Sequence, residues 1–349
     1  MADGSSDLPW VYEKMTTIAV DAMGGDHAPR EIVHGAVLAA KEVGASIQLV
    51  GPENILEEEL NKHSWLDLPI EIVPAYEVIP MDENQPASAV RKKPNSSIVV
   101  AMNQVSSGKA GGVVAAGSTG AATAAALFCL KRIEKIDRPC IAAVIPTHKK
   151  PVILVDAGAN LESTSLHLLQ NAFMGSALSK GMFKLQNPRI GLLNVGEEPG
   201  KGNNLVKEAY NLLKDAHQLN FIGNVEGRDV PEGVCDVCVC DGFVGNVFLK
   251  TTEGVAKMVA ILLREELTRD LKSKLGALLA KDSFYRLRKR IDYAEYGGAQ
   301  LLGVRGVCVI AHGSSQHIAI KNAIKVAKEA TEANLVSLIE QLAVNYVKA

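Results

Sequence analysis

The chain has 349 residues, of which 47% are hydrophobic and 22% charged, so it can bury a large core, and this composition excludes a disordered protein. The formal net charge of −2 gives no general reason to expect a nucleic-acid partner. The six cysteines lie inside apolar stretches, which suits buried thiols in a reduced, cytoplasmic protein better than a disulfide framework.

The first structural unit of the chain follows a short polar segment. Residues 1–14 lack the apolar stretch of a signal peptide, and we expect a disordered leader there, followed by one large α/β domain over 15–349. Residues 17–29 read as an apolar strand that enters a glycine turn at Gly24, Gly25 and Asp26. Apolar residues at helical spacing over 30–43 then predict a helix, which Gly44 ends.

The same order of strand, polar glycine-rich turn and helix recurs to the end of the chain. A proline-marked loop is expected over 80–94, and further strands are expected at 47–50, 70–73, 112–116, 152–155, 190–195, 221–222, 237–240 and 307–311. Near-continuous apolar strands separated by helices indicate a doubly wound, mostly parallel sheet covered on both faces. Right-handed crossovers are expected to bring the carboxyl ends of the strands, with their polar turns, to one edge.

The turns offer backbone N–H groups, amides and carboxylates with few cations, which suits a phosphate and a polarised carbonyl. One glycine after a strand is often only a tight turn, but seven such units before helix starts favour an anion site. The Gly24-Gly25 turn does not read GxGxxG and residues 196–203 lack a P-loop ending, so no nucleotide cofactor is expected. The cysteines at 235, 238 and 240 lack a second pair at metal spacing, and no metal is expected.

The sequence contains no GxSxG elbow and no recognisable triad, so direct attack by a bound nucleophile is the simplest mechanism. His312 follows the last predicted strand. It is interpreted either as an acid or base, or as a cap of the last helix.

A second distinctive region extends from about 250 to 292 and is predicted to form a protruding, basic, amphipathic helical hairpin. Apolar residues recur at i, i+4 over 255–275, residues 276–280 break this stripe, and nine basic against four acidic residues lie between Arg264 and Arg290. Its leucines either pack in a dimer interface or enter a bilayer surface, while its basic residues meet anionic lipid or an acidic protein; these roles can coexist. The residues expected at this membrane or acidic-protein contact are Leu275, Leu278, Leu279, Lys272, Lys274, Arg286, Arg288 and Lys289.

Several motifs together indicate a family. They are Asp21 to Pro29, Ala116 to Ala121, Leu192 to Glu197 with Lys201 to Asn203, Asn220 to Asp229, Asp241 to Asn246, Tyr296 to Gly298, and Ala311 to Ser315. From about Thr16 to about Ala330 the chain resembles the bacterial phosphate acyltransferases, the acyl-ACP:phosphate transacylases of phospholipid synthesis. The resemblance implies transfer of a long acyl chain from acyl carrier protein to inorganic phosphate. It also implies a fold related to phosphotransacetylases and isocitrate dehydrogenases, a homodimer, and peripheral membrane association.

With this resemblance, roles can be suggested for the turn residues. Phosphate is expected to bind at Gly24, Gly25, Asp26, Ser118, Thr119 and Gly120 and to attack the thioester carbonyl; Ser118 stands where relatives commonly have asparagine. Lys201 and Asn246 are expected to offset charge on the phosphate and the oxyanion, while Asp241 and His312 orient the site. Asp241 alternatively only caps a helix. The acyl substrate is expected near Asn160, Glu197, Asn224 and Gly245.

Two other functions stay open at this point. A nicotinamide-dependent dehydrogenase of the related fold is disfavoured by the missing dinucleotide fingerprint. A non-catalytic scaffold that binds acyl carrier protein at the membrane is the alternative from another functional class.

Overall fold

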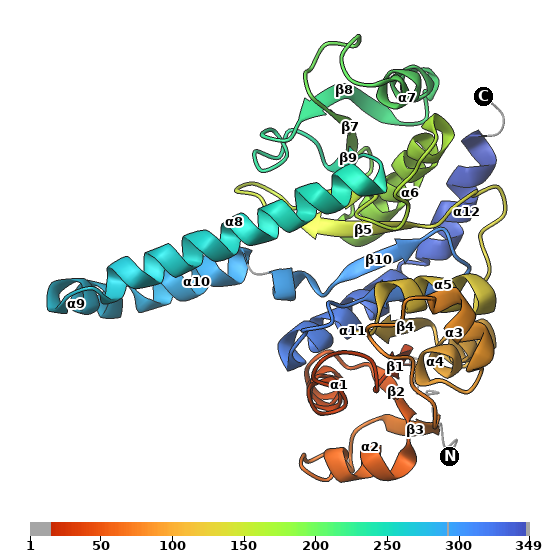
Figure 1. Ribbon diagram of the computed structural model, residues 1–349, viewed down its shortest axis with the longest axis vertical. Coiled ribbons are helices and arrows are strands. Elements are labelled where there is room, and N and C mark those ends of the chain that lie inside the picture. Colours follow the sequence, from red (N-terminus) through yellow and green to blue (C-terminus); the bar gives the residue numbers. More distant parts are fainter. Residues whose placement is uncertain (1–14, 292, 347–349) are drawn as a thin grey trace, which may run out of the picture.

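The computed structural model of the protein describes residues 15–291 and 293–346; the predicted leader, 1–14, lies outside this range. The strands are β1 (Thr17–Asp21), β2 (Ser46–Gly51), β3 (Ile70–Pro74), β4 (Gly112–Ala115), β5 (Cys140–Ile145), β6 (Val152–Val155), β7 (Arg189–Asn194), β8 (Asn220–Glu226), β9 (Val237–Val239), β10 (Ala299–Leu302) and β11 (Val307–Ile310). They form one 11-stranded sheet in the order β3-β2-β1-β4-β11-β10-β5-β6-β9-β7-β8 (Figure 1). The predicted α/β class with a large, mostly parallel sheet is confirmed.

Helices cover both faces of this sheet (Figure 1). They are α1 (Arg30–Glu42), α2 (Glu53–Leu60), α3 (Pro86–Lys92), α4 (Ser97–Ser106), α5 (Thr119–Cys129), α6 (Ser165–Phe183), α7 (Asn204–Asp215), α8 (Gly242–Thr268), α9 (Leu271–Leu279), α10 (Lys281–Ile291), α11 (His317–Glu332) and α12 (Leu335–Tyr346), with the 3₁₀ helix η1 (Tyr293–Tyr296). The prediction of a loop over 80–94 is wrong in part, because helix α3 begins within this range at Pro86. Proline fits the first position of a helix, where no N–H is needed.

Two apolar cores explain why the strands are buried on both sides. One core combines Ile18 and Val20 of β1 with residues of α1, α2, α6, α7, α11 and α12. The other combines Ala19 of β1 with residues of α3, α4 and α5, and Phe248 and Leu249 at the start of α8 pack against it. Alternate residues of a strand point to opposite faces, so each strand contributes to both cores.

Two strands that the sequence did not predict, β5 and β10, reverse the direction of the sheet at its centre. Strand β10 is antiparallel to β11 and to β5, and β5 is antiparallel to β6. The strands from β3 to β11 in the sheet order therefore run one way, and β6, β9, β7 and β8 run the other way. The expectation that all strands end at one edge is wrong, because these two antiparallel strands separate two parallel halves.

The two halves are nevertheless shifted along the strand direction. As a result, the carboxyl ends of strands from the two halves lie in the same row of paired residues. Val309 near the end of β11 pairs with Gln300, Gln300 pairs with Ala142, and Ala142 pairs with Val155, the last residue of β6. The ends of β11 and β6 thus share one row of the sheet. The turns that follow these two strands meet in one pocket, which is described below.

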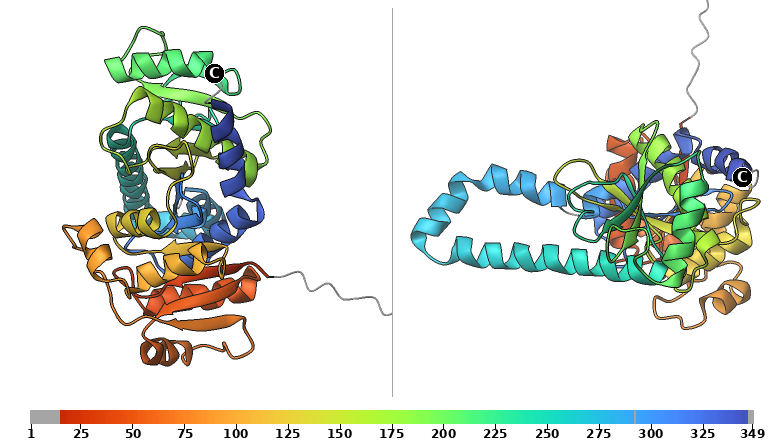
Figure 2. Two further views of the ribbon diagram at one scale, coloured as in Figure 1. Left: turned by 90° about the vertical axis from the view of Figure 1, so that its right-hand side faces the viewer. Right: turned by 90° about the horizontal axis from the view of Figure 1, so that it is seen from above.

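Helices α8, α9 and α10 form an arm that projects from the body, as Figure 1 and the view from above in Figure 2 show. The predicted protruding hairpin is confirmed, but its first helix ends at Thr268 and not at 276–280. Asp270 starts a new helix because its carboxylate accepts a hydrogen bond from the N–H of Ser273 at 2.8 Å, so Gly276 lies inside the tip helix α9. Among the described residues, no helix is long and apolar enough to cross a membrane.

Candidate active site

A pocket of about 300 Å³, here called the His312 pocket, opens where β11, β6, α5 and α8 meet. It contains residues from both halves of the sheet, including Gly158 after β6 and His312 after β11. Three residues predicted for the site line it: Thr119, Asn246 and His312. The staggered strand ends therefore do bring distant polar turns together, although by a different topology from the one expected.

The contacts of His312 with Ser314 favour one tautomer of its neutral ring. The backbone N–H of Ser314 donates to Nδ1 of His312 at 3.2 Å, and the Ser314 hydroxyl lies 2.8 Å from the same nitrogen. A backbone N–H can only donate, so Nδ1 is an acceptor and the proton of the neutral ring is on Nε2. His312 can therefore donate a hydrogen bond from Nε2 to a bound oxygen or sulfur.

Helix α8 presents three polar side chains to this pocket. The carboxylate of Asp241 accepts hydrogen bonds from the N–H groups of Phe243 and Val244, both at 3.0 Å, and so caps the helix. From this start Asn246, Lys250 and Glu253 fall on one face and line the pocket. The alternative role of Asp241 as a cap is thus seen directly.

Lys250 is a cation in the pocket that the sequence did not single out. Its Nζ lies 2.9 Å from Oε2 of Glu253, and half of its side chain (50%) is exposed. The spacing i, i+4 from Asn246 was a usable signal, since Asp241 is a good N-cap and a helix after it places both residues on one face. Glu253, which lies on the same face of α8, was not singled out from the sequence either.

The first turn of α5 offers N–H groups to an anion. Thr119 and Gly120 begin this helix after Ser118, and within the described part of the chain no side chain caps it. Two neighbouring helices differ, because Asp241 caps α8 and Glu31 accepts the His317 N–H of α11 at 2.9 Å. The first N–H groups of a helix have no partner within it, so α5 is the better of these anion sites.

The Gly24-Gly25 turn packs closely behind this region. A Cβ on Gly24 would lie 2.8 Å from the nitrogen of Gly117, and Gly25 has φ of +114°, which other residues rarely adopt. The N–H of Asp26 donates to the carbonyl of Gly313 at 2.9 Å. The turns after β1, β4 and β11 are therefore in contact, while a phosphate contact at Gly24, Gly25 or Asp26 stays a prediction.

A buried carboxyl group lies in the same turn. Asp21 at the end of β1 is 3% exposed. Burial raises the pKa of Asp21, and hydrogen bonds from Ser97, Met23 and Gly24 offset this only in part. This carboxyl group keeps its proton to a higher pH than an ordinary aspartate does.

Asp156 organises the other wall of the pocket. Its carboxylate accepts hydrogen bonds from four backbone N–H groups, those of Ile141, Gly158, Ala159 and Asn160, at 2.9 to 3.0 Å. The side-chain amide of Asn160 donates to Asp156 and to the carbonyl of Pro139, and a Cβ on Gly245 would collide with the carbonyl of Asp156. Asn160 and Gly245 therefore hold the turn that places Gly158 beside Asn246.

Comparison with known proteins identifies the family. Residues 16–338 match the family described as fatty acid synthesis protein. A phosphate acyltransferase of Pelotomaculum thermopropionicum is 52% identical over 318 residues, which cover 91% of this chain and 92% of the relative. A phosphate acyltransferase of Gloeobacter violaceus is 49% identical over 332 residues, 95% and 97% of the two chains. This chain belongs to the phosphate acyltransferase family.

Solved structures agree with the fold of this phosphate acyltransferase family member. A phosphotransacetylase from Streptococcus pyogenes has a TM-score of 0.61 at 16% identity, covering 92% of this chain and 95% of that one. The EutD phosphotransacetylase from Staphylococcus aureus has a TM-score of 0.57 at 16% identity, covering 91% and 94%. The predicted relation to the phosphotransacetylase fold is confirmed, and so is the prediction of an acyltransferase of lipid synthesis.

Three predicted site residues lie in a separate group at the far end of the sheet. The side chain of Asn224 donates to the carbonyl of Glu198 at 2.9 Å and to that of Glu197 at 3.4 Å. The carbonyl of Lys201 accepts from Asn194 in the same loop. Strands β7 and β8 carry this loop, and Figure 1 shows them at the opposite end from β1. The catalytic or substrate roles of Lys201, Glu197 and Asn224 stay predictions.

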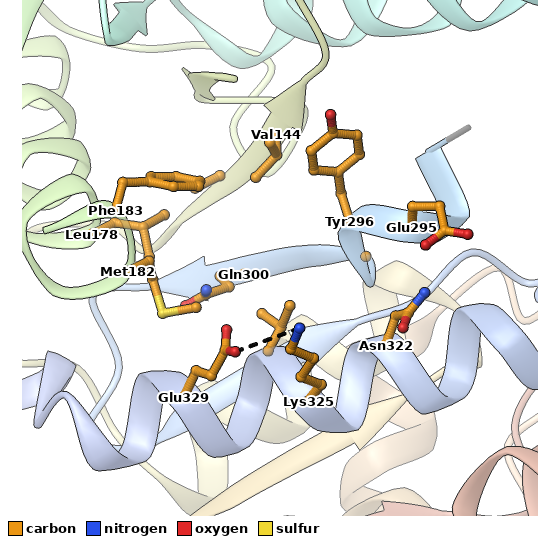
Figure 3. A pocket seen from close by; sticks show the side chains of 13 residues that line it. Val144, Leu178, Met182, Phe183, Glu295, Tyr296, Gln300, Asn322, Lys325 and Glu329 are labelled. Carbon is orange, nitrogen blue, oxygen red and sulfur yellow. Dashed lines mark ion pairs between the residues drawn. The ribbon is translucent and has the colours of Figure 1, made fainter. Parts of the chain in front are cut away.

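A second pocket, of about 160 Å³, lies on the other face of the sheet (Figure 3). Leu178, Met182 and Phe183 form its apolar wall, and the pair Lys325–Glu329, 3.8 Å apart, lies on the α11 side. It shares Val144, Tyr296 and Gly298 with the His312 pocket. None of the predicted site residues, among those described, lines it, so the His312 pocket is the better candidate for the chemistry.

Proposed function

We propose that this protein transfers a long acyl chain from acyl carrier protein to inorganic phosphate, and that the His312 pocket is where the transfer occurs. Membership of the phosphate acyltransferase family supports the reaction type. The single observation that carries the location is the meeting of His312, Asn246, Lys250 and the uncapped start of α5 in one pocket.

The proposed step has a simple atom balance. An oxygen of HPO₄²⁻ attacks the thioester carbonyl carbon, and the carbon–sulfur bond breaks as the new carbon–oxygen bond is completed. The proton of the phosphate ends on the departing sulfur, giving acyl phosphate and a thiol. A thiol has a reference pKa of about 8.5, so it is a good leaving group without a strong general acid.

Two groups of donors suit the charges that develop. The N–H groups of Thr119 and Gly120 would hold phosphate oxygens, with the turn at Gly24, Gly25 and Asp26 behind them. His312, through Nε2–H, and the side-chain amide of Asn246 would donate to the carbonyl oxygen as it becomes an oxyanion. One such donor contributes roughly 10²–10³ in kcat in other enzymes.

The cation that offsets the phosphate charge has two candidates. Lys201 was chosen from its glycine-rich turn, whereas Lys250 lines the His312 pocket itself. The position of Lys250, one helical turn after Asn246, favours it for direct contact. Lys201 would then need a different role, such as contact with the donor.

We also propose that the arm binds the membrane surface peripherally, on the cytoplasmic side, and meets acyl carrier protein. Its tip exposes Leu275, Leu278 and Leu279 by 60%, 67% and 83%. The basic residues Lys272, Lys274, Arg286 and Lys289 are exposed nearby, and the side chain of Arg288 lies outside what the structure describes. Apolar groups flanked by cations suit an anionic lipid surface, and the cations also suit an acidic protein.

A homodimer is the proposed assembly. Val255, Met258 and Leu262 lie on one face of α8 and are 49%, 52% and 52% exposed. Exposed apolar faces of this extent usually mark an interface. Packing of two arms along this face would bury it and leave the leucines of the tip for lipid.

Trapping of acyl phosphate with hydroxylamine tests the function. We expect acyl hydroxamate to form only when protein, phosphate and palmitoyl acyl carrier protein are all present. Omission of phosphate is the control, because hydroxylamine also reacts slowly with thioesters.

Other donors separate the alternatives. Activity with palmitoyl coenzyme A but not with palmitoyl acyl carrier protein would support acyl transfer to phosphate. It would contradict acyl carrier protein as the donor. No phosphate-dependent hydroxamate from any acyl thioester would overturn the proposal, and an absorbance change with a nicotinamide coenzyme would favour a dehydrogenase instead.

A further inference from the structure

A groove of about 520 Å³, here called the α8 groove, continues from the His312 pocket along helix α8. The two cavities share five residues, Val144, Leu249, Lys250, Glu253 and His312. They therefore adjoin one another and are taken together here as one connected space. Binding sites for small ligands typically have volumes of about 300–1,000 Å³, and the connected space is of this size.

The character of this space changes along its length. At the end shared with the His312 pocket it is lined by the polar side chains of Lys250, Glu253 and His312. Farther along α8 the helix contributes Ala256 and Ala260, one turn apart, which offer only methyl groups. The opposite wall is formed by Ile145 and Pro146 at the end of β5. A polar end thus leads into an open groove with a mostly apolar lining, to which Thr252 and Lys257 also belong.

The groove is also long in one direction. Asn246 in the His312 pocket and Ala260 in the α8 groove mark the two ends of the combined space on α8, and the fourteen helical steps between them extend about 21 Å at 1.5 Å per residue. The helix face between these residues is continuous, because Leu249, Glu253, Ala256 and Ala260 follow one another at spacings of three and four. A long and mostly apolar ligand with one polar end matches this space.

We propose that the α8 groove holds the acyl chain of the substrate, with the carbonyl carbon in the His312 pocket and the methyl end toward Ala260. This proposal rests on the proposed function. It places the acyl chain along α8 and not at Asn160, Glu197, Asn224 or Gly245, where the sequence had suggested the acyl substrate. The distance from the His312 pocket to Ala260 then limits how long a chain is fully accommodated.

Bulky substitutions at two depths test this assignment. In Ala260→Trp the far end of the groove is filled, and in Ala256→Trp it is filled one turn closer to the pocket. We expect kcat/KM for palmitoyl donors to fall about 10- to 100-fold while butyryl donors react at the wild-type rate, since each methylene kept out of an apolar site costs about 0.8 kcal/mol. Ala256→Trp should exclude shorter chains than Ala260→Trp does.

Asn211→Trp is the control, because it adds a tryptophan at an exposed position of α7, away from both the groove and the face of α8 proposed for the dimer. We expect it to leave both donors unaffected. Two results would overturn the assignment of the acyl chain to the groove. One is loss of activity with butyryl and palmitoyl donors alike in a folded Ala256→Trp protein. The other is no change with either donor in both groove variants. A wild-type protein that makes no hydroxamate from any donor would instead overturn the proposed function.

A measurement on the unaltered protein covers the case in which a variant does not fold. A palmitoyl phosphonate with a diazirine at its methyl end is irradiated with the full-length protein, and the labelled peptides are identified by mass spectrometry. We expect labels on residues 254–260 of α8 and on 145–146. Labels confined to other parts of the chain would place the acyl chain elsewhere and overturn the proposal.

Discussion

At the residue scale, His312 carries the most specific prediction, because the hydrogen bond from the Ser314 N–H identifies which ring nitrogen has the proton. Replacing His312 by Ala removes the Nε2–H donor, and we expect kcat for acyl phosphate formation to fall by about 100-fold or more. Ser314→Ala is the matched control. It removes the hydroxyl at 2.8 Å but keeps the backbone N–H bond, so we expect a loss of less than about tenfold.

The measurement is steady-state hydroxamate formation at saturating phosphate and acyl donor. If His312→Ala stays within a few-fold of wild type, His312 does not contact the reacting atoms. If Ser314→Ala is as damaging as His312→Ala, the hydroxyl and not the ring is the important group.

How much of the site could be predicted differs from residue to residue. Thr119 starts a helix, His312 lies in the turn after a strand and Asn246 lies near the start of a helix, and such positions can be recognised in the sequence. Lys250 lies two turns into α8, and only the combined start and direction of that helix place it in the pocket. Lys201 satisfied the local pattern of a turn, but local pattern does not reveal which half of the sheet a turn belongs to.

At the scale of single elements, the start of α8 decides whether Asp241 is structural. The Asp241 carboxylate accepts two N–H groups at 3.0 Å, so Asp241→Ala should lower the free energy of unfolding by about 1 kcal/mol. Asp241→Asn keeps an oxygen that can accept these bonds, and we expect nearly wild-type stability and activity. Urea unfolding and kcat, measured on the same samples, check both statements. A stable Asp241→Asn protein with at least 100-fold lower kcat would contradict a purely capping role. The Asp241 carboxylate would then take part in the reaction itself.

The elements that the sequence missed have a common physical reason. Most predicted strands were recognised as apolar runs followed by a glycine turn and a helix. Strand β10 has only four residues and follows the glycine pair Gly297-Gly298, and β5 is followed by a loop and then by β6 with no intervening helix. Neither strand belongs to a repeating strand–helix unit, so the pattern that revealed the parallel halves could not show where they join.

At the scale of the whole molecule, the arm has two parts: the first turns of α8 line the His312 pocket and the α8 groove, and the rest projects away from the body. Its helices extend far from the sheet in Figure 1 and in the right-hand view of Figure 2. Its charge and its apolar stripe were visible in the sequence, because both are local properties of consecutive helical turns. Its protrusion was predicted as well, but where its helices begin and end was not, because the break at Arg269 and the new start at Asp270 lie outside the apolar pattern.

The exposed leucines of the tip give the last prediction, which concerns how the molecule meets a membrane. Leu278 and Leu279 are 67% and 83% exposed, and burying a leucine in an apolar phase contributes roughly 1.5–3 kcal/mol. The double variant Leu278→Glu, Leu279→Glu should therefore bind vesicles of anionic phospholipid at least about 100-fold more weakly in flotation assays. Leu66→Glu is the control, because Leu66 is an equally exposed leucine (84%) on the body of the protein. Unchanged flotation of the double variant, together with a shift from dimer to monomer in sedimentation, would assign these leucines to the dimer interface instead.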